Sequence, residues 1–236
     1  AQRALPGRVM QGQQLPLPVQ LRESASFDSF FRGPNSDAVA ALRELSGAVL
    51  ISGAPGSGRT HLLQAVARTR RCPYLPLVEL RKFGADALAG LERAPVLCLD
   101  DLHSVTANRD WALALLRLLD ARRAHNLATA MSTDAAPERM PCALPDLRTR
   151  LSASAVFGLH PLSDADREQL LRERAQARGL ELAPEVSRWL LRQLARDTGS
   201  LLAALDRLDR ASLSAKRRLT LPFVQSVLAP GTAQTG

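Results

Sequence analysis

The sequence predicts an α/β protein with a parallel five-stranded sheet covered by helices on both faces, followed by a small helical domain. Up to about residue 160, uninterrupted apolar runs take turns with helical segments, which is typical of strands buried on both faces of a parallel sheet. A glycine-rich segment joins the first run to the next helix. After residue 160 the periodicity is purely helical.

The composition agrees with this fold class. Of 236 residues, 46% are hydrophobic but only 4% are aromatic, so we expect a core of Leu, Ala and Val. The net charge of +8 is spread along the chain and does not form a basic tail or stripe. No apolar run approaches the ~20 residues of a membrane helix, no secretion signal is recognised, and the three cysteines are widely spaced. We therefore expect a cytoplasmic protein without membrane contact.

Three parts are expected along the chain. Residues 1–24, rich in Gln and Pro, are predicted to be an extended arm. Residues 25–160 are predicted to form the sheet domain, with strands at 48–52, 74–80, 95–99, 127–132 and 155–159 and helices at 36–45, 60–70, 85–91 and 110–124. Residues 161–236 are predicted to form the helical domain, with helices at 164–177, 184–196, 200–215 and 222–228 and a short segment at 219–221 that leads into the last helix.

The glycine-rich segment has the context of a phosphate-binding loop, because it follows a strand and opens a helix. Its glycines let backbone N–H groups turn toward phosphate oxygens, and the helix N-terminus adds partial positive charge. Arg59 stands where a lysine is usual, and its planar guanidinium cannot copy a point-like ammonium. The candidate phosphate-binding residues are Gly53, Ala54, Pro55, Gly56, Ser57, Gly58, Arg59 and Thr60.

Two adjacent carboxylates, Asp100 and Asp101, end an apolar strand about 40 residues after this loop. In that position one carboxylate is expected near a Mg²⁺ ion that also contacts Thr60, and the other can orient a water molecule. Asp101 takes the water-orienting position, although the side chain usual there is the longer Glu. We expect phosphate binding to survive this set of residues better than hydrolysis does.

Together with the polar strand end near Ser132 and the helical appendage, these motifs resemble the AAA+ ATPases. Residues 27–35, FDSFFRGPN, are similar to a segment with the pattern FDxFxxG and a nearby Asn that borders the adenine in the DnaA initiator family. Residues 144–151, 162–164 and 205–212 resemble the Hda branch of DnaA-related proteins most closely, and the resemblance covers about residues 14–228.

The resemblance implies roles for particular residues. Ser132 would be the sensor, and Arg150 the arginine finger, which we expect to be exposed beside the lid without a buried carboxylate partner. Asn35 and His61 would contact the nucleotide, ADP or ATP with Mg²⁺. Arg59 is shared within the Hda branch. The arginine expected at the start of a lid helix falls at Gly199, with Arg196 as a possible substitute.

The arm carries a second resemblance. Gln14, Leu15 and Leu17 lie in a QLPLP segment that is similar to the peptide by which this family binds the bacterial sliding clamp. A Gln amide can orient such a peptide while the two leucines fill apolar pockets.

The function that the resemblance implies is a regulator of replication initiation. Such a chain would bind ADP, dock on the DNA-loaded clamp, and stimulate ATP hydrolysis by DnaA through Arg150. Its own ATPase would be weak or absent, its contact with DNA indirect, and a homo-oligomer possible. The alternative is a stand-alone AAA+ ATPase such as a helicase loader or a clamp-loader subunit; the initiator itself is disfavoured because no DNA-binding domain follows residue 228.

Overall fold

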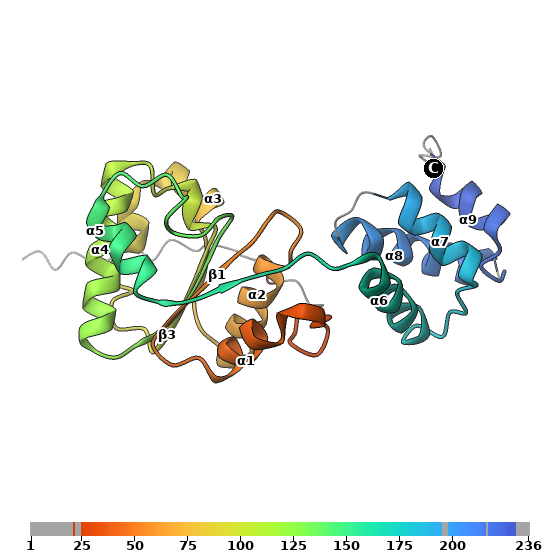
Figure 1. The fold of residues 1–236 in the computed structure, drawn as a ribbon, viewed down its shortest axis with the longest axis horizontal. Coiled ribbons are helices and arrows are strands. Elements are labelled where there is room, and N and C mark those ends of the chain that lie inside the picture. Colours follow the sequence, from red (N-terminus) through yellow and green to blue (C-terminus); the bar gives the residue numbers. More distant parts are fainter. Residues whose placement is uncertain (1–20, 22–24, 195–197, 216, 230–236) are drawn as a thin grey trace, which may run out of the picture.

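The structure, a computed structural model, describes residues 21, 25–194, 198–215 and 217–229 (Figure 1). Its five strands form one parallel sheet in the order β2-β3-β4-β1-β5. The strands are β1 (Ala48–Ser52), β2 (Tyr74–Pro76), β3 (Val96–Asp100), β4 (Ala128–Thr133) and β5 (Ala155–Gly158). The predicted five-stranded parallel sheet is therefore confirmed.

Helices cover both faces of this sheet (Figure 1). The helices α1 (Ser36–Glu44) and α2 (Arg59–Arg70) pack on one face. On the other face lie α3 (Leu77–Leu80), α4 (Arg109–Ala124) and α5 (Pro145–Ser152). Short 3₁₀ turns complete the domain at Gly33–Asn35, Arg81–Phe83, Ala85–Leu88 and Leu102–Ser104.

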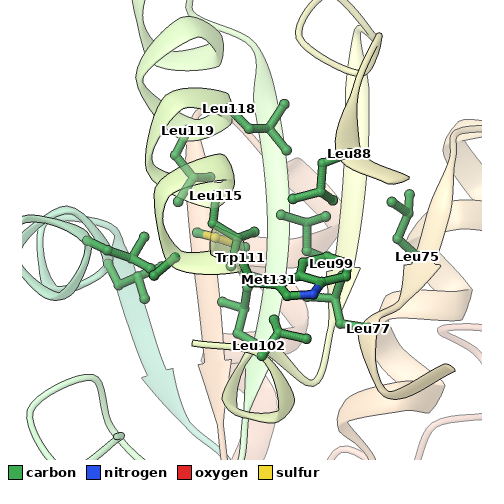
Figure 2. Close-up of a cluster of buried hydrophobic side chains, with 14 of the residues drawn as sticks. Leu75, Leu77, Leu88, Leu99, Leu102, Trp111, Leu115, Leu118, Leu119 and Met131 are labelled. Carbon is green, nitrogen blue, oxygen red and sulfur yellow. The ribbon is translucent and has the colours of Figure 1, made fainter. Parts of the chain in front are cut away.

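Each central strand contributes to both layers because successive side chains point to opposite faces. On β3, Leu97 and Leu99 join the cluster under α4, whereas Cys98 packs on the α2 side. Figure 2 shows the first of these clusters, in which Trp111 and Leu115 of α4 lie over Leu99 and Met131. Burial on both faces explains why these strands read as continuous apolar runs.

Several predicted boundaries are wrong, each for a local reason. The run 74–80 is not one strand, because Pro76 lacks an N–H for the ladder and Leu77 and Leu80 then bury themselves on a helical turn. The helix expected at 85–91 is a 3₁₀ turn that ends before Gly90, whose φ is +83°. The last helix begins at Leu221, one residue earlier than expected, after Leu219 has packed into the helical core.

One helix was not predicted at all. The α5 helix begins with Pro145 in its first turn and buries Leu147 and Leu151, which are spaced i, i+4. It carries Arg148 and Arg150.

The C-terminal helices form a separate small core. They are α6 (Asp164–Gln176), α7 (Pro184–Gln193), α8 (Thr198–Ala215) and α9 (Leu221–Leu228). Ser163 caps α6 through a reciprocal hydrogen-bond pair with Asp166. Leu171, Leu190 and Leu205 meet at the centre of this cluster. None of the helices in the described part of the chain is long and apolar enough to span a bilayer.

The buried side chain of Arg122 connects α4 to the sheet. Arg122 on α4 is 1% exposed, and its guanidinium donates to the carbonyl oxygens of Leu91, Ala94 and Ala128 and to the hydroxyl of Thr129 at 2.6–2.9 Å. Desolvation lowers the pKa of Arg122. One side chain thus ties α4 to β4 and to the segment that leads into β3.

We expect Arg122→Ala to lower the free energy of unfolding by about 3 kcal/mol or more, because buried acceptors lose a charged donor. Urea denaturation measures the change. The neighbouring Arg123 is exposed, and Arg123→Ala, which removes the same charge, should stay within ~0.5 kcal/mol of the parent. Equal losses of unfolding free energy in the two variants would contradict the stabilising role of the Arg122 hydrogen bonds.

Candidate functional site

The glycine-rich loop follows β1 and opens α2, as predicted. The Gly53 N–H donates to the carbonyl of Thr133 at the end of β4, which holds the loop against the neighbouring strand. Gly56 and Gly58 have φ values of +80° and +96°, which favour glycine. The loop therefore turns tightly before the first residue of α2, Arg59.

A cavity of about 410 Å³ lies between this loop, the segment after residue 28 and the helical domain. The loop side is lined by residues 56–61, the opposite side by Ser29, Phe30, Phe31 and Asn35, and the helical-domain side by Leu162, Leu170, Thr198, Gly199 and Leu202. Its size and mixed polar and apolar lining are typical of a small-molecule site.

Two buried polar atoms at this loop lack a hydrogen-bond partner among the described residues: the hydroxyl of Ser57 and Nη1 of Arg59. The Arg59 side chain is only 10% exposed. Unpaired donors buried beside a helix N-terminus fit an anionic ligand such as a phosphate group. The residues present therefore suit the phosphates of a nucleotide.

The two predicted carboxylates meet Ser132 at the same edge of the sheet. The Ser132 hydroxyl donates to Oδ1 of Asp100 and accepts from the Asp101 N–H at 2.9 Å. Tyr74 donates to the other oxygen of Asp100 at 2.6 Å. Both oxygens of Asp100 thus have protein donors before any ligand arrives.

Asp101 faces the cation of the loop. Its Oδ1 lies 3.3 Å from Nη2 of Arg59, and Nδ1 of His103 lies 3.9 Å away. Burial raises the pKa of Asp101, the charge of Asp100 adds to the increase, and Arg59 opposes it. The predicted water-orienting carboxylate is thus paired with the predicted phosphate-binding cation.

A magnesium ion would draw on few protein ligands here. The described residues contain no cluster of three His, Cys, Asp or Glu side chains suited to a metal. Thr60 and Asp100 supply hydroxyl and carboxylate oxygens, the ligands that Mg²⁺ prefers, and Mg²⁺ usually completes its coordination with water and phosphate oxygens. The two residues therefore fit an ion that arrives with a nucleotide.

Asn35, on the side of the site predicted to border the adenine, connects its own segment to His160. Its side chain donates to the carbonyl of His160 at 3.1 Å and accepts from the His160 N–H at 2.7 Å. His61 contacts Ser29 and Ser26 through Nε2, and its ring lies 5.6 Å from that of Phe30. Asn35 and His61 both line the cavity, while their polar atoms also hold its walls.

The helical domain forms one side of the cavity. Among the described residues, those that it contributes to the lining include no basic side chain. Gly199, in the first turn of α8, lies where the resemblance expects an arginine, and glycine offers no cation. Arg196 lies outside the described residues. Arg174 on α6 donates to the carbonyl of Ser29, which joins the helical domain to the segment beside the loop.

Arg150 lies elsewhere. It is on α5 and lines a hollow of about 230 Å³ with Gly47 and Ala48, at the start of β1, whereas the phosphate loop follows the end of β1. The expectation that it lies beside the lid is wrong, since α5 is on the side of the sheet away from the helical domain (Figure 1). It forms an ion pair with Asp120, which is 46% exposed and so is not a buried partner.

The remaining predicted residues belong to the part of the chain that the structure does not describe, and two residues beside the site were not predicted. Gln14, Leu15 and Leu17 lie outside the described residues. Tyr74 was hidden in an apolar run, and no motif marks it because its contact with Asp100 arises from the pairing of β2 with β3. The sequence gives no signal for His103 either, yet its Nδ1 accepts from the Asp134 N–H at 3.2 Å and lies beside Asp101.

The sheet order, the phosphate loop, the paired carboxylates and the helical lid define an AAA+-type protein. Solved structures share this fold. Domain III of Thermotoga maritima DnaA matches with a TM-score of 0.73 at 20% identity, over 89% of this chain and 97% of that one. AMPPCP-bound DnaA from Aquifex aeolicus matches with a TM-score of 0.67 at 19% identity, over 81% and 67%. The RuvB Holliday junction branch migration motor of Thermotoga maritima gives 0.60 at 16% identity, over 89% and 72%.

The helical domain also has a match to a known family. Residues 164–228 match the family described as Hda, lid domain. Together with the DnaA-like fold of the whole, this match supports a DnaA-related AAA+ protein of the Hda type.

We expect Gly58→Val to lower the affinity for ADP at least tenfold. A Cβ at this position would lie 2.5 Å from Cε2 of Phe30, and the φ of +96° costs a side chain about 1–2 kcal/mol. Isothermal titration calorimetry measures the affinity. Gly90→Val carries similar backbone strain at φ +83° in open space, so it should lower stability without changing ADP affinity. An unchanged ADP affinity of Gly58→Val would show that the loop does not bind the nucleotide.

Proposed function

We propose that this chain is a regulator that binds ADP in the described cavity and stimulates hydrolysis of the ATP held by a DnaA protomer. The observation that carries the proposal is the separation of Arg150 from the chain's own phosphate loop. They lie at opposite ends of a five-residue strand, roughly 15 Å long at ~3.3 Å per residue. An arginine so placed suits a nucleotide on another molecule better than its own.

The chain's own hydrolytic residues support the same proposal. Arg59 is paired with Asp101, so the phosphate-binding cation and the water-orienting carboxylate engage each other. Ser132 and Tyr74 engage both oxygens of Asp100. ADP, bound with Mg²⁺ through Thr60 and Asp100, would be retained as a ligand, and the metal would neutralise its phosphate charge.

In this proposal Arg150 supplies the chemistry in the partner's site. A guanidinium placed at the γ-phosphoryl oxygens stabilises the negative charge that they carry in the transition state, and an arginine supplied in trans accelerates hydrolysis by roughly 10³–10⁵-fold. On α5, 31% of the Arg150 side chain is exposed, which is enough for a partner molecule to contact it. The DnaA-like fold and the Hda-type lid favour DnaA as that partner.

We expect Arg150→Ala to reduce the stimulated rate of DnaA ATP hydrolysis by about 10³-fold or more, because the γ-phosphoryl charge loses its counterion. Phosphate release is measured with DnaA, the clamp loaded on DNA, and ADP. Melting temperature and ADP affinity should not change, since Arg150 lies away from the cavity.

Arg148→Ala is the matched control. Arg148 lies on the same helix, and its contact with the Met140 carbonyl is long at 3.5 Å. If Arg148→Ala lost stimulation and Arg150→Ala kept it, the assignment would move to Arg148. Turnover near ~10 s⁻¹ by the chain alone, the median for enzymes, would instead favour a stand-alone ATPase.

We also propose that the arm docks the chain on the sliding clamp through Gln14, Leu15 and Leu17. Changing all three to Ala should abolish clamp binding, because each buried anchor of a short peptide contributes about 1–4 kcal/mol. Surface plasmon resonance with immobilised clamp measures it. The control changes Gln11, Gln13 and Val19 to Ala and should bind normally.

A deletion of residues 1–20 tests the same assignment and leaves Leu21, which packs against the sheet domain, in place. Full clamp binding by this deletion would refute the assignment to the arm. Earlier melting of the triple variant would show instead that the segment packs on the domain as a structural strap.

A further inference from the structure

The surroundings of Arg150 contain a single described ion-pair partner. Its Nη2 lies 2.6 Å from Oδ1 of Asp120, which projects from the second half of α4. Within the described residues Asp120 pairs with no other cation. The guanidinium of Arg122, two residues further along α4, is already engaged by three carbonyls and a hydroxyl.

The remaining donors of Arg150 are not used by any described acceptor. Its Nε is buried and has no hydrogen-bond partner, and no hydrogen bond of its Nη1 to a described residue is present. One nitrogen of the planar guanidinium thus lies against a carboxylate, while N–H groups on the other nitrogens are left over. A guanidinium has five donors in a fixed fork, so it can contact a carboxylate and a phosphoryl oxygen together.

We propose that Asp120 is a positioning residue that orients Arg150 for the partner's phosphoryl group. This inference rests on the proposed function of Arg150. An arginine side chain has many rotamers, and fixing one of them before the partner arrives removes part of the ordering cost from the reaction.

The exposure of both side chains favours a positioning role for Asp120 over a role in keeping Arg150 away from the partner. Arg150 is 31% and Asp120 46% exposed, so water screens their attraction. A pair of this kind biases the rotamer of Arg150 and leaves the other donors of its guanidinium to a phosphate. Asp120 therefore affects how well Arg150 is placed more than whether it is available.

The test measures stimulated ATP hydrolysis by DnaA over a range of concentrations of the full chain, with clamp-loaded DNA and ADP. Asp120→Ala should lower the maximal rate about fivefold and leave the half-saturating concentration unchanged. Asp120→Asn should also lower it, because the charge is lost, whereas Asp120→Glu should recover most of the rate. Melting temperatures should match that of the parent.

The control variant is Asp110→Ala, which removes the same charge from the exposed first turn of α4 and should stimulate normally. Parental or higher rates in Asp120→Ala, a change confined to the half-saturating concentration, or failure of Asp120→Glu to recover the rate would each overturn the positioning role. Arg150→Ala, run alongside, separates the two proposals. If Arg150→Ala stimulates DnaA normally, the assignment of Arg150 as the arginine finger is wrong. If Arg150→Ala loses stimulation while Asp120→Ala stimulates normally, only the positioning role of Asp120 is refuted.

Discussion

The insertion of β4 between β1 and β3 is the constraint on which the site depends. Since all three strands are parallel, their carboxyl ends meet at one edge, where the phosphate loop, Asp100 and Ser132 come together. The hydrogen bonds of the Ser132 hydroxyl to Asp100 and to the Asp101 N–H join β4 to the end of β3. The N–H of Gly53 in turn joins the loop to β4. Each functional group is thus held by a neighbour that is distant in sequence.

The same sheet separates the cavity from the hollow beside Arg150. Its carboxyl edge faces the cavity and the Hda-type lid, and its amino edge carries the hollow beside Arg150. Arg122 stiffens this amino edge from within, because it anchors α4 to β4 just beside Asp120. In the proposed function the chain holds one nucleotide and offers an arginine to another, and the described linings of the cavity and of the hollow share no side chain.

Charge pairing at the carboxyl edge explains why binding and hydrolysis need not go together. A lysine ammonium is a compact charge, whereas the fork of Arg59 can face Asp101 and still leave a buried donor unpaired in the loop. Burial raises the pKa of Asp101, and Arg59 opposes that increase. The arrangement leaves donors at the predicted phosphate site, while the carboxylate predicted to orient water is engaged by the protein.

The sequence by itself determined the alternation of strands and helices, the phosphate loop and the acidic strand end, because apolar periodicity and glycine spacing are local properties. It also determined the change to a helical domain after residue 160. It did not reveal α5, the break at Pro76, or the contacts of Tyr74 and His103. Those depend on strand order and on which helices pack together. The pairing of Asp120 with Arg150 is the clearest case, since 30 residues separate them and only the packing of α5 on α4 brings the two charges within 2.6 Å.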